Sequence, residues 1–305
     1  MTTIALPGTD STTATPQAAP PVRRSGAKGG TGGRAGRAGP VTYTLLTLSA
    51  LVSIFPLYWT MVAGSHTNAE IAATPPPFLP DASLFENIGA ALEQAPIGLA
   101  ILNSVVVAGS ITVGTVLFCT LAGFAFAKLR FRGKGLLLSL VIGTMMVPTQ
   151  LAVIPLFMMI AELQWVNQLQ AVVLPTLVSA FGVFFMRQYL ISALPDELLE
   201  AGRVDGASTA RIFWSIVVPV ARPAMAVLAM LTFLTAWNDF FWPIIALTNS
   251  NPTVQVALAG LGSGYVPQRA VIMAGTLLGT LPVLIVFAVL GKQIVGGIMQ
   301  GAVKG

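Results

Sequence analysis

Residues Pro195–Pro223 read PDELLEAGRVDGASTARIFWSIVVPVARP, a charged stretch between two long apolar runs. Because both runs are long enough to cross a membrane, we expect the stretch to lie in water while its neighbours lie in lipid. The proline that opens it suits the start of a helix, and Asp196 and Glu197 favour the positive end of the helix dipole. Gly206 can take the left-handed conformation that ends a helix, and Ser208 can cap the next one. The local chemistry therefore predicts helix, tight turn and helix.

The composition places the chain in a membrane. Hydrophobic residues make up 55% of it and charged residues only 9%, whereas soluble domains have about 25% charged residues. A spanning helix needs about 20 apolar residues. Six segments meet this requirement, at residues 41–64, 98–127, 136–161, 168–190, 221–246 and 270–291. The sequence predicts an all-α polytopic membrane protein with six transmembrane helices in a domain over residues 41–305.

The basic residues predict the direction of these spans. Of the 16 Lys and Arg residues, 15 lie before the first span, between the second and third, between the fourth and fifth or at their adjoining ends, or after the sixth. The other side has only Arg269, with the acidic residues Glu70, Asp81, Glu86, Glu93 and Glu162. By the positive-inside rule, both termini and the loop at residues 191–220 are expected in the cytosol, and the protein in the cell (inner) membrane. The net charge of +5 thus reflects topology, and no nucleic-acid partner is expected.

The first 40 residues are rich in Thr, Ala, Pro and Gly and contain five basic residues. Such a segment cannot bury enough apolar surface to offset its ordering entropy, so we expect a disordered cytosolic tail. The pair Arg23-Arg24 and the sequence Ala63-Gly64-Ser65 could suggest a cleaved export signal. The apolar run from Val41 to Gly64 has 24 residues, however, and a signal core has about 7 to 15. We interpret it as a retained first span.

The charged loop also has a characteristic spacing. Its residues Glu200, Ala201 and Gly202 are followed after three residues by Gly206, and after nine more by Ile216, Val218 and Pro219. This resembles the signature loop of ABC importer permeases, with Gly202 in place of a second alanine and Val218 in place of a leucine. We call residues 191–220 the signature loop. The alternative is a solvated connection without a partner.

The resemblance implies a coupling helix between spans four and five, which lies in a groove of a cytosolic ATPase subunit. The ATPase-coupling residues that it implies are Glu200, Ala201, Gly202, Asp205, Gly206, Ile216 and Pro219.

Further motifs resemble the carbohydrate-importing, MalG-like permeases. They are Phe55–Trp59, Leu121–Ala127, Trp237-Asn238-Asp239 and the terminal Gly301–Gly305. The resemblance implies the type I ABC importer permease fold and an assembly with a second homologous permease, two cytosolic ATPase subunits and an external solute-binding protein. It implies no enzymatic activity and no cofactor on this chain, with ATP and Mg on the partner ATPase. The glycine-rich run Gly29–Gly39 lacks the Lys-Ser/Thr ending of a phosphate-binding loop.

The function implied is a permease that moves a sugar, oligosaccharide or sugar derivative by alternating access. One alternative is a permease of the same architecture for another solute, such as a glycerol phosphate or a polyamine. Another class is a secondary transporter or a membrane scaffold that needs no ATPase. A secondary transporter usually shows inverted repeats or ion-coupling charges within its spans, and the sequence shows neither.

Four polar residues within the spans are candidates for the translocation path, because polar groups are costly in lipid. Asp239 lies about 25 Å along a helix from Arg222, which places it near the outer edge of the hydrocarbon core. Together with Asn238 and the neighbouring aromatic residues it is interpreted as interfacial, with a gate or path carboxylate as the functional alternative. Asn103 and Gln150 are path candidates as well, or residues that hold helices together.

Other features of the spans concern their shape. Pro148 and Pro155 are expected to bend the third span, because each removes a backbone hydrogen bond. Gly275 and Gly279 form a pair of small residues four apart, which is typical of close helix packing in the last span.

The loops and the lone cysteine offer no metal site. The loop at 65–96 is expected to contain a short surface helix within residues 81–94, and its His66 is interpreted as an ordinary surface residue. The run Arg130–Lys134 is expected to form a tight basic turn that anchors the chain at lipid headgroups. Cys119 has no second cysteine for a disulfide or a chelating cluster.

Overall fold

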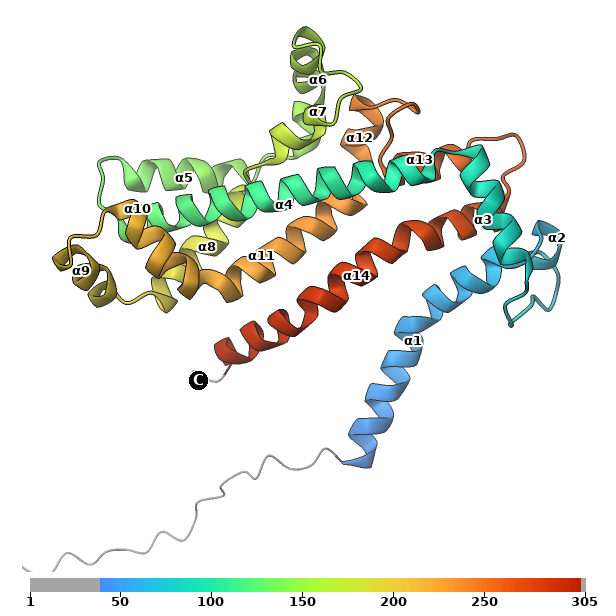
Figure 1. Cartoon of the computed structure of the whole chain (residues 1–305), viewed down its shortest axis with the longest axis horizontal. Helices are drawn as coiled ribbons and strands as arrows, with labels where there is room; N and C mark the ends of the chain where they lie inside the picture. Colours follow the sequence, from blue (N-terminus) through green and yellow to red (C-terminus); the bar gives the residue numbers. More distant parts are fainter. Residues whose placement is uncertain (1–38, 303–305) are drawn as a thin grey trace, which may run out of the picture. The chain divides into compact units, whose positions relative to one another are not determined.

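The computed structural model describes residues 39–302, with side chains described up to residue 289 and at residue 291. This part of the chain consists of helices and their connections, without a strand (Figure 1). Four of its helices are long and apolar enough to cross a membrane, or six if each of two bent helix pairs is one span. Of the tail predicted at 1–40, residues 1–38 lie outside the described residues. The chain divides into two units, Met1–Leu51 and Val52–Gly305, with the boundary inside the first helix.

Three helices precede the central bundle. They are α1 (Pro40–Gly64), α2 (Asn68–Ile71) and α3 (Ser83–Gln94). The helix α2 begins with a capping box, in which the side chains of Thr67 and Glu70 each accept from the other's backbone N–H. The short surface helix predicted within residues 81–94 is confirmed as α3.

The central bundle forms around α4 (Ile97–Lys128), which packs along α8 (Ala180–Ala193) and α11 (Val218–Asn238). Figure 1 shows these helices side by side. Small residues let α4 and α8 approach closely: a Cβ at Gly123 would lie 2.7 Å from the Cβ of Met186, and one at Gly182 would lie 2.7 Å from the Sγ of Cys119. Close backbone approach of this kind is how spanning helices gain packing contacts in lipid.

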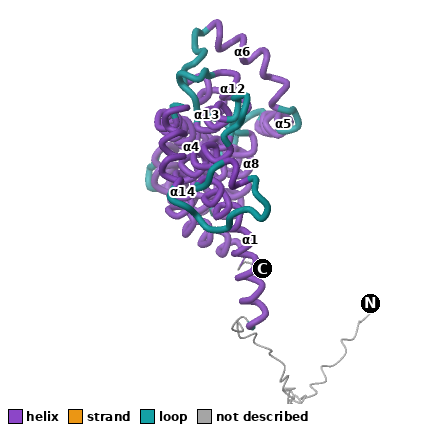
Figure 2. The backbone as a smooth tube through the Cα atoms, turned by 90° about the vertical axis from the view of Figure 1, so that its right-hand side faces the viewer, coloured by secondary structure: helices purple, strands orange, loops and turns teal. Residues whose placement is uncertain are grey.

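The third predicted span is broken rather than bent smoothly. It consists of α5 (Lys134–Thr144), the 3-10 turn η1 (Thr149–Ala152) and α6 (Val153–Glu162), with an angle of 91° between the two arms. Figure 2 shows α6 projecting at the same end of the molecule as α12. The break lies directly before η1, where Pro148 has no N–H to offer, as predicted. The expectation for Pro155 is wrong, because this proline lies in the first turn of α6, where no intrahelical donor is needed.

The fourth span is also interrupted. The turns α7 (Gln170–Val173) and η2 (Leu174–Thr176) meet α8 at an angle of 42°. The side chain of Ser179 caps α8 by accepting from the backbone N–H of Gly182, at 3.3 Å. The interruption leaves backbone groups at the middle of the bundle, where they adjoin α4.

The signature loop contains α9 (Asp196–Val204) and α10 (Thr209–Ile212), followed by the π-helical turn η3 (Phe213–Val217) and α11. The fifth apolar helix therefore begins at Thr209 rather than at residue 221, and it ends at Asn238. A separate helix, α12 (Phe241–Ala246), covers the remainder of the span predicted to reach residue 246.

The chain ends with α13 (Val254–Leu261) and α14 (Arg269–Ala302). The pair predicted to pack closely does so: a Cβ at Gly275 would lie 3.1 Å from Ile97 and 3.2 Å from Leu258, and one at Gly279 would lie 2.7 Å from Val254. Both glycines therefore let α14 approach α4 and α13.

The interpretation of His66 as a surface residue is wrong. It is 8% exposed, and its Nδ1 lies 2.9 Å from the carbonyl oxygen of Val62. The loop folds back over it, because Ser65 accepts from the N–H of Asp81 at 2.9 Å and Asn87 donates to the His66 carbonyl at 3.0 Å.

Candidate functional site

The signature loop folds as the sequence predicts. Gly206 has φ +76°, in the left-handed region, and its N–H donates to the carbonyl of Arg203 at 3.0 Å. The N–H of Ala207 donates to the carbonyl of Gly202 at 2.9 Å. These two bonds make a Schellman motif, the usual glycine end of a helix. The hydroxyl of Ser208 then caps α10 by accepting from the N–H of Arg211, at 3.3 Å.

One face of α9 packs on the start of the next helix. Leu199 and Gly202 are buried, and a Cβ at Gly202 would lie 3.2 Å from Ile216 and 3.3 Å from Ile212. This explains why glycine suits the position at which the signature has its second alanine, since an added methyl group would press on two isoleucines. The buried face therefore ties α9 to η3 and α11.

Much of the rest of the signature loop is exposed. It includes five of the predicted coupling residues, namely Glu200, Ala201, Asp205, Gly206 and Pro219. It also carries apolar side chains that sequence reasoning missed: Val204 is 88% exposed and Trp214 is 59% exposed. Exposed apolar groups beside charged ones are typical of a protein–protein contact. The signal in the sequence was the presence of bulky apolar residues at positions the signature leaves open.

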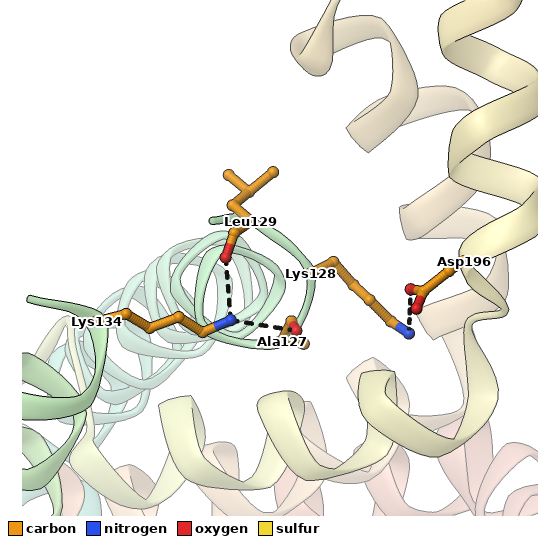
Figure 3. A network of polar contacts seen from close by, with 5 residues as sticks. All are labelled: Ala127, Lys128, Leu129, Lys134 and Asp196. Carbon is orange, nitrogen blue, oxygen red and sulfur yellow. Dashed lines mark hydrogen bonds and ion pairs between the residues drawn. The ribbon is translucent and has the colours of Figure 1, made fainter. Parts of the chain in front are cut away.

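Two lysines hold the end of α4, one against α9 and the other against the start of α5 (Figure 3). The Nζ of Lys128 lies 2.8 Å from Oδ1 of Asp196, the first residue of α9. The Nζ of Lys134 donates to the carbonyls of Leu129, at 3.0 Å, and Ala127, at 3.4 Å. A cation at these carbonyls is favourable because they are unpaired in a helix end. Lys134 of the basic run and Lys128 just before it thus have intramolecular partners, in addition to the lipid contact that the sequence predicts for the run.

The ion pair makes the contact between α4 and α9 dependent on pH. The Lys128 ammonium donates to Asp196 and attracts its charge, and so it holds the pKa of that carboxyl below its usual range. A carboxyl with a lowered pKa contributes stability that is present above its ordinary pKa and is lost as the pH falls through the lowered value. The pair is therefore intact at neutral pH.

A cavity of about 390 Å³ lies between α4, the break before α8, and α11. Its polar lining residues are Thr115, Thr176, Ser179, Thr232, Thr235 and Asp239, and the others are apolar. Asp239 is half-buried at the end of α11, where its Oδ1 accepts from the N–H of Phe241 at 3.1 Å. It is the one of the four predicted path residues that lines this cavity.

The other three path candidates lie elsewhere. Asn103 is buried and donates from Nδ2 to Oδ1 of Asn251, at 2.8 Å, and to the carbonyl of Pro252, at 2.9 Å. Its amide thus holds the segment before α13 against α4, which is the packing role that the sequence analysis left open. Asn238 is exposed and donates to the carbonyl of Leu234, and Gln150 is exposed on η1.

In residues 39–302 there is no group of three or more His, Cys, Asp or Glu side chains that could hold a metal ion.

Comparison with known proteins agrees with this geometry. Residues 119–298 match the family described as "Binding-protein-dependent transport system inner membrane component". The chain belongs to this family. The prediction that the chain is an ABC importer permease is thereby confirmed. The chain is a membrane-embedded component of a transport system.

Two named relatives differ in their solute. The permease is 36% identical over 265 residues to the lactose transport system permease protein LacG of Rhizobium radiobacter, which covers 87% of this chain and 96% of the relative. It is 34% identical over 269 residues to the sn-glycerol-3-phosphate transport system permease protein UgpE of Salmonella typhi, covering 85% of this chain and 95% of the relative.

A solved structure supports the predicted fold. A chain of a bacterial ABC transporter involved in the import of the acidic polysaccharide alginate is 23% identical, with a TM-score of 0.72 over 83% of this permease and 94% of that chain. The predicted all-α type I permease fold is confirmed.

Proposed function

We propose that this permease is the membrane subunit through which an ATP-driven importer passes a sugar, an oligosaccharide or a sugar derivative by alternating access. The observation that carries the proposal is the signature loop, whose helix, left-handed glycine turn and second helix present an exposed face with charged and apolar groups. Such a face fits a groove on a cytosolic ATPase subunit. The solute class is supported by the resemblance to LacG.

The contacts of α9 suggest how a movement of the ATPase reaches the spans. Leu199 and Gly202 pack on η3, which continues without a break into α11. The Lys128–Asp196 pair joins α9 to α4 as well. Since α4 and α11 both line the cavity, a displacement of α9 acts on two of its walls. A π-helical turn such as η3 is often found at functional sites, where it changes the register of the helix.

The proposed assembly contains a second homologous permease, two ATPase subunits that hold ATP and Mg, and an external solute-binding protein. The many exposed apolar side chains of the spans suit contact with lipid and with the partner permease. We place the signature loop and both termini in the cytosol, as the distribution of basic residues favours.

Thiol labelling tests this orientation. In intact cells, Ser83→Cys and Ser263→Cys are expected to react with an impermeant thiol reagent added outside, whereas Ser208→Cys is expected to react only after the membrane is permeabilised. The native Cys119 is fully buried and should not react with the reagent. External labelling at Ser208→Cys would overturn both the orientation and the contact with the ATPase.

Uptake tests the solute class. Deleting the gene is expected to abolish accumulation of at least one of radiolabelled lactose, maltose or another neutral sugar, and a plasmid copy is expected to restore it. The binding protein of the same transporter, once purified, is expected to bind the same sugar. If only sn-glycerol 3-phosphate or spermidine depended on the gene, the permease would serve the alternative solute classes, the first of which the likeness to UgpE favours.

A further inference from the structure

The cavity between α4, α8 and α11 has the dimensions of a small-molecule site. Its volume is about 390 Å³, within the range of about 300 to 1,000 Å³ that such sites occupy. Most of its wall surface is apolar, and six of its eleven lining residues bring a hydroxyl or a carboxyl group to it. Helix interruptions next to a cavity at the middle of a bundle are where transport proteins hold their solutes.

Three of the five hydroxyl groups that line this cavity donate their hydrogens within the protein, and those of Ser179 and Thr232 remain able to donate. Thr115 donates to the carbonyl of Thr176 at 3.5 Å, Thr176 donates to the carbonyl of Val172 at 3.0 Å, and Thr235 donates to the carbonyl of Leu231 at 2.9 Å. A hydroxyl has one hydrogen and two lone pairs. Each of these oxygens can therefore accept a hydrogen bond from a solute but has no hydrogen left to donate.

Asp239 adds a further acceptor of hydrogen bonds to the lining of this cavity. When ionised, the carboxylate of Asp239 only accepts hydrogen bonds, and the bond from the N–H of Phe241 to Oδ1, at 3.1 Å, occupies part of its capacity. Among the described residues that line the cavity, none is Lys or Arg. A phosphate or carboxylate in this space would meet the carboxylate of Asp239 and no cationic side chain of this lining, whereas a solute rich in O–H groups would find acceptors for its hydrogens at Thr115, Thr176 and Thr235.

We propose that this cavity holds the solute during its passage, and that Asp239, in a lining without Lys or Arg, selects neutral polyhydroxylated solutes against anions. The inference rests on the proposed function and deepens it. It favours a neutral sugar, as lactose is in the name of LacG, over a phosphorylated solute, as sn-glycerol 3-phosphate is in the name of UgpE.

The charge of the cavity can be measured with thiol reagents of opposite charge. Thr235→Cys, in a Cys119→Ala background, places a thiol at an exposed position of the lining. The whole transporter, purified through a tag on this chain, is treated with trimethylammonium-ethyl or with sulfonato-ethyl methanethiosulfonate. We expect the cationic reagent to react faster, relative to free cysteine, by about 10-fold, because charge focuses counter-ions in a cleft with low-dielectric walls.

The matched control removes the charge and keeps the shape. Asp239→Asn combined with Thr235→Cys should bring the ratio of the two rates back toward that of free cysteine. A ratio that Asp239→Asn leaves unchanged would overturn the role of Asp239. A thiol at position 235 that neither reagent reaches would overturn the cavity as an aqueous site.

Protection of the same thiol tests the solute class. Lactose at millimolar concentration is expected to slow the labelling of Thr235→Cys more than sn-glycerol 3-phosphate at the same concentration does. Equal or greater protection by sn-glycerol 3-phosphate would overturn the inference. Failure of the proposed function would show separately, as unchanged sugar uptake in cells that lack the gene, because that measurement involves neither Thr235 nor Asp239.

Discussion

A transporter carrying Gly206→Pro is expected to reach the membrane at near wild-type abundance and to lose ATP-driven transport. Gly206 has φ +76°, and its N–H bonds to Arg203 to close the helix end. Proline fixes φ near −65° and has no N–H, so it can form neither feature. Gly206 lies outside the apolar helices, which is why insertion should survive. The measurements are membrane abundance by immunoblot, co-purification of the ATPase, and ATP hydrolysis stimulated by the loaded binding protein.

Gly206→Asn is the matched control. Asparagine tolerates the left-handed region, and a Cβ at this position would meet no atom within 4 Å. This variant should therefore transport at close to the wild-type rate. Transport by Gly206→Pro at the wild-type rate would show that the loop merely connects two spans.

A charge reversal on the exposed face tests the same contact without changing the turn. Glu200→Lys should weaken co-purification of the ATPase, because losing one member of a buried charge pair between proteins costs about 2 to 5 kcal/mol. Glu162→Lys, at the end of α6, is the control for the added charge, and it should behave as wild type. Equal loss of the ATPase in both variants would contradict a specific role for Glu200.

The features that sequence predicted well are those decided locally. The thickness of the hydrocarbon core fixes how many apolar residues a span needs, so the long runs were visible before any contact was known. The turn at Gly206 was visible too, because its left-handed conformation and the cap at Ser208 depend on residues a few positions apart. Such features need no knowledge of the rest of the fold.

Other features depend on residues far apart in the chain. The sequence could not distinguish a path role from a packing role for Asn103, since its partners at Asn251 and Pro252 belong to a distant segment. His66 was misjudged for the same reason, because Asp81 and Asn87 bring the covering loop onto it. The cavity is a further example: Asp239 was a candidate by its residue type alone, and its hydroxyl neighbours come from three different helices.

A similar dependence on distant contacts makes Asn167 important, although no local pattern of residues singles it out. Its Oδ1 accepts from the N–H and the hydroxyl of Thr248, at 3.0 and 2.9 Å, and its Nδ2 donates to Ser250 at 3.1 Å. Its backbone N–H donates to the carbonyl of Ala246 at 2.8 Å, and its φ is +63°. Asn167 thus joins the turn after α6 to the segment after α12.

Asn167→Ala is expected to destabilise the permease by about 2 to 4 kcal/mol, from the loss of three side-chain hydrogen bonds and the strain of alanine at positive φ. For a domain of this size, the midpoint of thermal unfolding of the detergent-purified protein should fall by about 5 to 10 °C. Asn167→Gly relieves the strain but lacks the side-chain bonds, so its midpoint should fall by less. Asn167→Asp keeps the acceptor for Thr248 and loses only the donor to Ser250, and it should be the mildest of the three. If Asn167→Ala unfolded at the wild-type temperature, these side-chain bonds would be replaceable by water, and the backbone bond from Asn167 to Ala246 and the apolar contacts around Trp242 would be enough to hold the two segments together.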